Sequence, residues 1–186
     1  EFILRSWDKR YSKIPDALIL EGPLAGGHLG FSEEQLQQID KYSLETLLPE
    51  ILETIKPYED RYGKKIPVVA AGGIFTGADI ARMLRLGASG VQMATRFVCT
   101  KECGVSQEFK QHYLDAKKED IVLTSSPVGL PGRAIRNKFV QARKRPVDEN
   151  LVKGVARRDL VCLCVENDLN RLPGIGSTVH IYEIVA

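Results

Sequence analysis

The chain has 186 residues, 44% of them hydrophobic and 27% charged, which suits one soluble domain with a core and argues against a disordered or collagen-like chain. Its apolar runs fall short of the roughly 18 residues that span a bilayer, and residues 1–10 lack the pattern of a secretory signal. We therefore expect no membrane partner and a cytoplasmic location. Four cysteines are too sparse for a disulfide-stapled fold.

The first predicted unit is a strand followed by a long helix. Residues 17–20 form a short apolar run that ends in the glycine-rich stretch 21–30, which is typical of a buried strand and its loop. Residues 43–62 carry leucine and isoleucine every three to four positions, which predicts an amphipathic helix. Because Pro49 and Pro57 fall inside that pattern, we expect a kink or two shorter helices.

Two further strand and helix units follow. A strand is predicted at 66–71, closed by the turn Gly72–Gly73 and followed by a helix at 77–86. Residues 89–95 indicate a strand that runs into a loop, and a helix is predicted at 106–118. Strands that alternate with helices imply parallel pairing with right-handed crossovers, so the predicted fold class is α/β.

The pattern changes after residue 120. We expect an extended segment at 120–125, a turn-rich loop at 127–132, and possible strands at 160–166 and 179–185. The sequence thus predicts an ordered region over residues 1–140. Residues 141–186 form an irregular extension that is not confidently a separate domain.

Positive charge is concentrated near the start of that extension. Residues 133–158 contain nine Lys or Arg against two acids, although the net charge of the chain is only +2. A basic run can bind nucleic acid, but this one has no interleaved aromatic residues and no recognition motif. We therefore expect a solvated segment and no nucleic-acid partner.

Small residues follow two successive predicted strands. The carboxyl ends of parallel strands meet at one edge of a sheet, so Gly72 and Gly73 should lie beside Ala94 and Thr95. Glycine allows a ligand to approach the backbone, and free N–H groups before a helix attract anions. A Gly-Gly turn alone is more often only a turn, but the ordered pair of loops favours a phosphate cradle.

His28 is the candidate for acid–base chemistry. It stands among glycines at a predicted strand end, where an imidazole is accessible to a substrate. An isolated histidine would more often be an ordinary loop residue, but the predicted cradle on the same face favours catalysis. The spacing of Cys99 and Cys103 from Cys162 and Cys164 matches no common zinc motif, so we expect no metal, and we expect the first two cysteines to be small buried residues.

Four stretches of the sequence together resemble the nitronate monooxygenases, formerly called 2-nitropropane dioxygenases. These are Glu21–Gly30 with its Gly-Gly-His loop, Ile66–Ile74, Gly90–Phe97 and Ser126–Ile135. The resemblance covers roughly residues 14–140. It implies an FMN-dependent TIM barrel in which a histidine assists the oxidation of an alkyl nitronate by oxygen, giving a carbonyl compound and nitrite.

The same resemblance assigns roles by position. His28 would be the catalytic histidine, and Gly26 and Gly27 would line the flavin. The residues that would hold the FMN phosphate are Gly72, Gly73, Ala94 and Thr95, and Gln92 would point into the barrel near the flavin. The family usually has glycine where this chain has Ala94, whose methyl group would crowd the phosphate while its N–H still donates.

A TIM barrel needs about 250 residues, and this sequence supplies three convincing barrel strands, which resemble the sixth to the eighth. We therefore expect the chain to be the C-terminal portion of a flavoenzyme, with an open sheet edge and a half-exposed barrel interior. Alone it should bind FMN poorly. A homo-oligomer or a complementary N-terminal chain would cover the open edge.

Two alternatives remain open. A flavin-dependent enoyl-acyl-carrier-protein reductase resembles the same fold and shares the Gly-Gly-His loop, although residues 32–65 and Pro23-Leu24-Ala25 look more like the monooxygenases. The other alternative is a non-catalytic fragment that binds a partner through its exposed edge or its basic segment.

Overall fold

The computed structural model describes residues 2–125 and 130–142, and these form two units. The first unit comprises residues 2–25 and 33–95, and the second comprises residues 26–32 together with the described residues from 96 onwards. The helices are α1 Phe2–Tyr11, α2 Glu33–Leu36, α3 Leu44–Tyr62, α4 Gly77–Arg85, α5 Thr95–Val98, α6 Gln107–Asp115 and α7 Lys138–Ala142, and η1 Lys118–Asp120 is a 3-10 turn. The strands are β1 Leu18–Glu21, β2 Gly27–His28, β3 Val68–Ala71, β4 Gly90–Gln92, β5 Ile121–Ser125 and β6 Pro131–Ile135.

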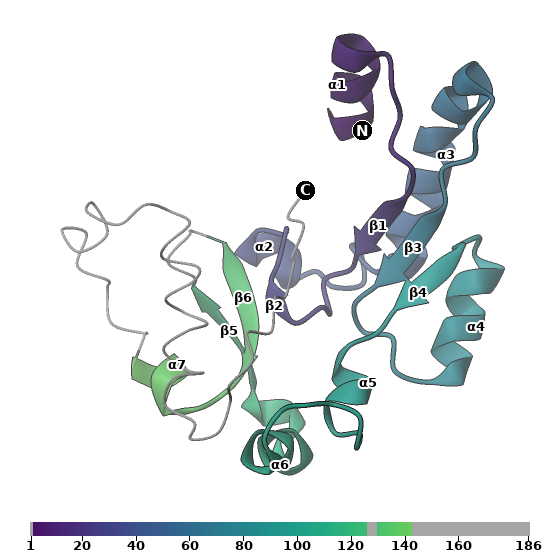
Figure 1. Cartoon of the computed structure of the whole chain (residues 1–186). Helices are drawn as coiled ribbons and strands as arrows, with labels where there is room; N and C mark the ends of the chain where they lie inside the picture. Colours follow the sequence, from purple (N-terminus) through teal and green to yellow (C-terminus); the bar gives the residue numbers. More distant parts are fainter. Residues whose placement is uncertain (1, 126–129, 143–186) are drawn as a thin grey trace. The chain divides into compact units, whose positions relative to one another are not determined.

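The first unit contains a parallel sheet in the order β1-β3-β4 (Figure 1). Leu18 of β1 pairs with Val68 of β3, and Ala71 at the end of β3 pairs with Gln92 at the end of β4. The helices α3 and α4 make the two crossovers between these strands. The predicted α/β pattern of parallel strands and intervening helices is confirmed for this unit.

The long helix α3 is continuous from Leu44 to Tyr62 and contains both prolines. Ser43 caps its start by accepting a hydrogen bond from the N–H of Thr46, and Gly63 ends it in the left-handed conformation with φ of 61°. The expectation of two shorter helices is therefore wrong. The strong caps and a buried apolar face offset the two hydrogen bonds that the prolines cannot donate.

The core of the first unit lies between its sheet and its helices. Strand residues Val68 and Ala70 are fully buried, and they pack in one cluster with Leu48 of α3 and Met83 of α4. Leu4 of α1 belongs to the same cluster and is 1% exposed. The unit therefore has the apolar core that its sequence pattern indicated.

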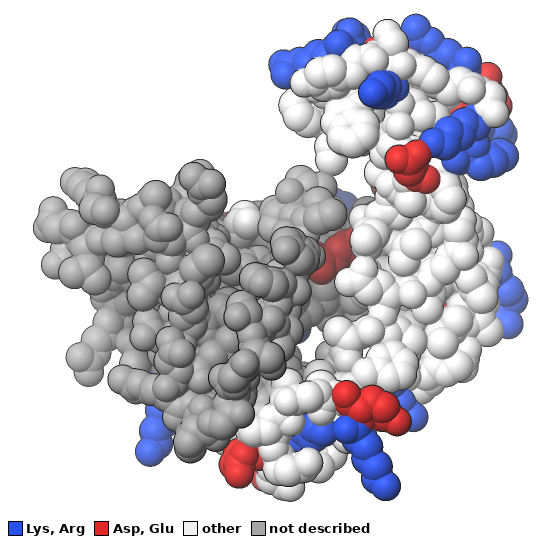
Figure 2. Space-filling view, viewed as in Figure 1, with Lys and Arg blue, Asp and Glu red and all other residues white. Residues whose placement is uncertain are grey.

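The N-terminal helix α1 has no counterpart among the predicted elements. Its Asp8 accepts hydrogen bonds from Arg61 at 2.8 Å and from the Tyr62 hydroxyl at 2.6 Å, both near the end of α3. Figure 2 shows basic side chains gathered around α1 and this end of α3. No helix in the described residues is long and apolar enough to span a membrane.

The second unit has an antiparallel sheet in the order β2-β6-β5. The predicted extended segment at 120–125 is confirmed as β5. The prediction of loop structure for Gly27 and His28, and for Pro131 and Gly132, is wrong, because these residues form β2 and the start of β6. The cross-strand hydrogen bonds between them depend on sequence-distant pairing, which a local pattern does not reveal.

Several predictions fall outside the described residues. They are the loop residues 127–129, the possible strands at 160–166 and 179–185, and nearly all of the extension at 141–186. The boundary near residue 140 stays a prediction.

Candidate functional site

The structure brings five of the predicted cofactor residues to one end of one sheet. Ala71 and Gln92 are paired across β3 and β4, so the residues that follow them leave the sheet side by side. Those residues are Gly72 and Gly73 after β3, and Ala94 and Thr95 after β4. The adjacency of the two loops, which was inferred from the rhythm of strands and helices, is present in the fold.

The glycines after β3 are required by the backbone itself. Gly72 has φ of 91° and Gly73 has φ of 75°, both in the region that side chains rarely adopt. A Cβ on Gly72 would lie 2.9 Å from the Cβ of Ala25, and one on Gly73 would lie 2.8 Å from the Cβ of Leu24. Close packing against the segment after β1 thus explains both glycines without a ligand.

The same backbone conformation leaves donors available. Among the residues that the structure describes, the N–H groups of Gly72 and Gly73 donate no hydrogen bond. Gly73 is exposed to solvent, as are Ala94 and Thr95, which follow β4. Uncommitted N–H groups at the exposed end of a parallel sheet suit an anion, so the loop can serve both packing and phosphate binding.

The helix α4 begins directly after this loop. Its N-cap Thr76 accepts a hydrogen bond from the N–H of Asp79, and the Asp79 carboxylate accepts from the N–H groups of Phe75 and Thr76. The Thr76 hydroxyl and these backbone donors hold the pKa of Asp79 below its usual value. This capping box fixes the geometry of the turn that carries the two glycines.

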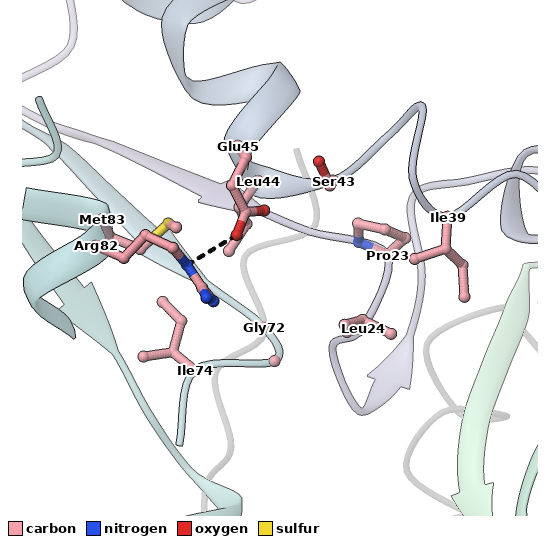
Figure 3. Close-up of a pocket in the computed structure, with 11 residues that line it drawn as sticks. Pro23, Leu24, Ile39, Ser43, Leu44, Glu45, Gly72, Ile74, Arg82 and Met83 are labelled. Carbon is pink, nitrogen blue, oxygen red and sulfur yellow. Dashed lines mark ion pairs between the residues drawn. The ribbon is translucent and has the colours of Figure 1, made fainter. Parts of the chain in front are cut away.

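A small cavity lies behind the glycine loop, between it and the start of α3 (Figure 3). The guanidinium of Arg82 lies in its wall and is committed to two carboxylates, with Nε 2.9 Å from Glu45 and a terminal nitrogen 3.0 Å from Asp79. The cavity measures about 60 Å³, which is well below the roughly 300 Å³ of the smallest ligand pockets. A flavin ring cannot enter it, so a flavin would have to approach the exposed side of the loop.

The remaining two cofactor positions of the first unit differ in setting. Gln92 ends β4 and is exposed. Thr95 was predicted in a loop, whereas it is the first residue of the short helix α5. A helix of only four residues is too short to show a periodic pattern in the sequence.

His28 lies in the second unit, together with Gly26 and Gly27. It is half-buried in β2 and pairs with Gly132 of β6, while Gly27 pairs with Arg133. Gly27 has φ of 76°, whereas a side chain on Gly26 would meet no atom within 4 Å. The catalytic role of His28 and the flavin contacts of the two glycines stay predictions.

Two neighbours of His28 were not singled out as site residues. Gly132 is buried, and a Cβ there would lie 3.4 Å from the carbonyl oxygen of Gly27. Burial lowers the pKa of Arg133 from its usual value. The only available signal was their position in the stretch Ser126–Ile135, which resembles the same family as the histidine loop.

The solvent exposure of the cysteines differs from the prediction. Cys99 is exposed and Cys103 is half-buried, so the expectation that both are buried is wrong. They lie in the irregular segment between α5 and α6, where no regular face turns them inward. No group of three or more His, Cys, Asp or Glu in the described part of the chain could hold a metal ion.

Comparison with known proteins assigns the α/β chain to a family. The family profile of nitronate monooxygenase matches residues 4–159, and the chain belongs to this family. A "Probable nitronate monooxygenase" of Staphylococcus saprophyticus is 38% identical over 135 residues, and one of Staphylococcus haemolyticus is 37% identical over 131 residues. The predicted family is confirmed, and the match extends beyond the residues on which the resemblance was based.

These relatives are much longer than the matched region. The match covers 72% of this chain and 36% of the S. saprophyticus protein, and 70% and 34% for the S. haemolyticus protein. The chain thus spans about a third of the length of the curated relatives it matches. Among solved structures, FabK from Thermotoga maritima is similar with a TM-score of 0.59 and 28% identity, covering 89% of this chain and 44% of that one.

Proposed function

We propose that this chain is part of a flavin-dependent nitronate monooxygenase and supplies the loops that hold the phosphate of FMN. One observation carries the proposal. The ends of β3 and β4 are paired, so the N–H groups of Gly72 and Gly73 lie beside the exposed loop of Ala94 and Thr95. The membership of the chain in the nitronate monooxygenase family supports this assignment.

The residues present fit a phosphate group. The N–H groups of Gly72 and Gly73 would donate to its oxygens, and the Thr95 hydroxyl would add a third donor. Ala94 would contribute its backbone N–H, while Gln92 would lie toward the ring. A bound flavin would accept electrons from the substrate and pass them to oxygen.

The proposed acid–base group is His28. Its imidazole would move a proton at the substrate carbon while an alkyl nitronate is converted to a carbonyl compound and nitrite. Gly26 and Gly27 would leave room beside it for the flavin. The pairing of β2 with β6 holds the imidazole on a sheet rather than on a mobile loop, which favours precise positioning.

The sheet of the first unit supports the proposal that a larger barrel surrounds it. Leu18 and Leu20 pack on the core, so Ile19 points to the other face by strand alternation, and it is 59% exposed. Figure 2 shows an extensive uncharged surface on this unit. An exposed apolar side chain on this face of the sheet suits contact with further barrel strands, supplied by a longer form of this protein, by a complementary chain or by a second copy.

The phosphate cradle is tested by comparing FMN with riboflavin, which lacks the phosphate. We expect Ala94→Asp to weaken FMN binding tenfold or more, about 1.4 kcal/mol, because a carboxylate would face the phosphate. Riboflavin binding should change little. Ala17→Asp is the matched control, since Ala17 is also exposed but precedes β1 at the opposite end of the sheet.

Fluorescence quenching of both flavins gives the dissociation constants. An equal loss for FMN and riboflavin, or an equal effect of Ala94→Asp and Ala17→Asp on FMN, would contradict the cradle. A longer family member then separates the reactions. Oxygen consumption with an alkyl nitronate supports the monooxygenase, and nicotinamide consumption with an enoyl thioester supports the reductase alternative.

A further inference from the structure

Two free thiols lie close together in sequence, in the segment that joins α5 to α6. Cys99 is exposed and Cys103 is half-buried. Free cysteine is among the most buried residue types, and an accessible thiol is open to oxidation. Packing alone therefore does not account for this pair.

The backbone between the two cysteines is curled. It bends sharply at each of residues 100–102, and the N–H of Thr100 donates to the carbonyl oxygen of Phe97 at 3.1 Å. An extended stretch of this length would separate the two Cα atoms by roughly 13 Å, whereas a disulfide needs about 4.4–6.8 Å. Successive bends shorten the separation toward that range.

A buried lysine ties the curl to the next helix. Lys110 of α6 is only 6% exposed, and its Nζ donates to the carbonyl oxygen of Thr100 at 2.6 Å. The Sγ of Cys99 lies 3.7 Å from the carbonyl oxygen of Lys110. The curled segment is thus fixed against α6 at two points, one of which is the first thiol itself.

Tyr113, also on α6, is sensitive to charge on both thiols. Burial raises the pKa of the Tyr113 phenol, and negative charge on Cys99 and on Cys103 raises it further. Tyr113 lies three residues after Lys110, so both project from neighbouring turns of one helix face. The direct contact of Cys99 with Lys110 places the start of the curl against α6, and the Tyr113 pKa agrees with that placement.

We propose that Cys99 and Cys103 are a peroxide-sensitive dithiol that closes to an intramolecular disulfide. One thiolate attacks a peroxide oxygen, which breaks the O–O bond and leaves a sulfenic acid and one water after proton transfer. The second thiol then attacks the sulfenic sulfur and releases a second water. The two thiols lose two electrons and two protons in total, and hydrogen peroxide accepts them.

The sequence makes this linkage easy to detect. Lys101 lies between the two cysteines, so trypsin separates them into the peptides 97–101 and 102–110. The full-length chain is treated with hydrogen peroxide, its remaining thiols are alkylated, and the digest is analysed by mass spectrometry. We expect the two peptides to appear joined, at a mass lower by two hydrogens than their sum, and to separate on reduction.

Two comparisons show whether the fold directs the reaction. The joined peptide should persist in the double variant Cys162→Ser/Cys164→Ser and disappear in Cys99→Ser. It should also form several-fold faster in the native chain than in concentrated urea. The proposal is overturned if peroxide gives only sulfinic or sulfonic acid at Cys99, if Cys99 joins Cys162 or Cys164 instead, or if urea does not slow the linkage.

Discussion

The two units of this chain are built on different balances of apolar burial and hydrogen bonding. In the first, most of the buried hydrophobic side chains form one cluster that draws on α1, α3, α4 and the sheet. In the described part of the second, Leu29 is the buried hydrophobic residue, and the buried polar residue is Lys110. Its β5 residues Ile121 and Leu123 are 48% and 41% exposed.

The difference indicates where the chain can fold by its own contacts. Burial of apolar surface stabilises a folded protein by about 25 cal/mol per Å². The buried side chains of the first unit form a continuous core that gains this stabilisation. The described part of the second unit depends more on strand hydrogen bonds, which contribute only about 0.5–1.5 kcal/mol each, and on single contacts such as that of the Lys110 ammonium with Thr100, at about 1.5–3 kcal/mol. We therefore expect the first unit to be the more stable of the two.

The largest expected effect on stability comes from shortening a side chain in the core of the first unit. Leu48 is fully buried, so Leu48→Ala should lower the free energy of unfolding by about 2–5 kcal/mol through lost contacts and a residual cavity. The chain has a single tryptophan, Trp7, and it lies in α1 of the first unit. Urea denaturation followed by Trp7 fluorescence therefore reports on this unit.

The matched control is the same substitution on the second sheet. Leu123 is 41% exposed, so Leu123→Ala should shift the Trp7 transition by less than about 0.5 kcal/mol. Equal losses from the two variants would show that the units unfold as one, and the contrast between them would then be wrong.

Glycine conformation gives a second, smaller contrast. Gly87 has φ of 104°, and a Cβ there would lie 2.7 Å from Cδ1 of Leu52. Gly87→Ala should cost about 1–3 kcal/mol, chiefly through the backbone, since the leucine side chain can shift. Gly104 has no positive φ and no atom near its Cβ position, so Gly104→Ala should change stability by less than about 0.5 kcal/mol. Urea denaturation of both variants checks this, and a costly Gly104→Ala would contradict it.

The sequence predicted the first unit well for the same reason that this unit is stable. Continuous apolar runs at β1 and β3 and a 3.6-residue period in α3 reflect burial that is encoded locally. The second unit was predicted less well, because β2 is two residues long and exists only by pairing with residues about 105 positions later. Local patterns carry no signal for such a strand.

The residues of the candidate site also differ in how well the sequence predicts their placement. The cradle residues Gly72, Gly73, Ala94 and Thr95 could be placed together from the rule that parallel strand ends share an edge, and the fold has them there. The partners of His28 across β2 and β6 could not be found in this way. Their pairing is antiparallel and follows a long connection, so only the family resemblance linked the two stretches.

The smallest expected effect is on the pKa of one tyrosine in each unit. The hydrogen bond that Tyr62 donates to Asp8, together with the negative charge of Asp8, raises the pKa of Tyr62. For Tyr113 burial is the largest cause, ahead of the charges of Cys99 and Cys103. Asp8→Ala removes the main cause, because it leaves no side-chain acceptor for the Tyr62 hydroxyl, whereas Cys99→Ser/Cys103→Ser removes only the lesser causes for Tyr113. Both pKa values should fall, that of Tyr62 further.

Absorbance at the tyrosinate band, titrated from neutral to alkaline pH, measures both values. Tyr62→Phe and Tyr113→Phe identify the two signals among the six tyrosines. Because a raised pKa favours the neutral phenol in the folded state, each group's contribution to stability is present below the ordinary pKa near 10 and is lost as the pH rises through the raised value. An unchanged Tyr113 titration in the double cysteine variant would mean that charge on the two thiols does not act on Tyr113.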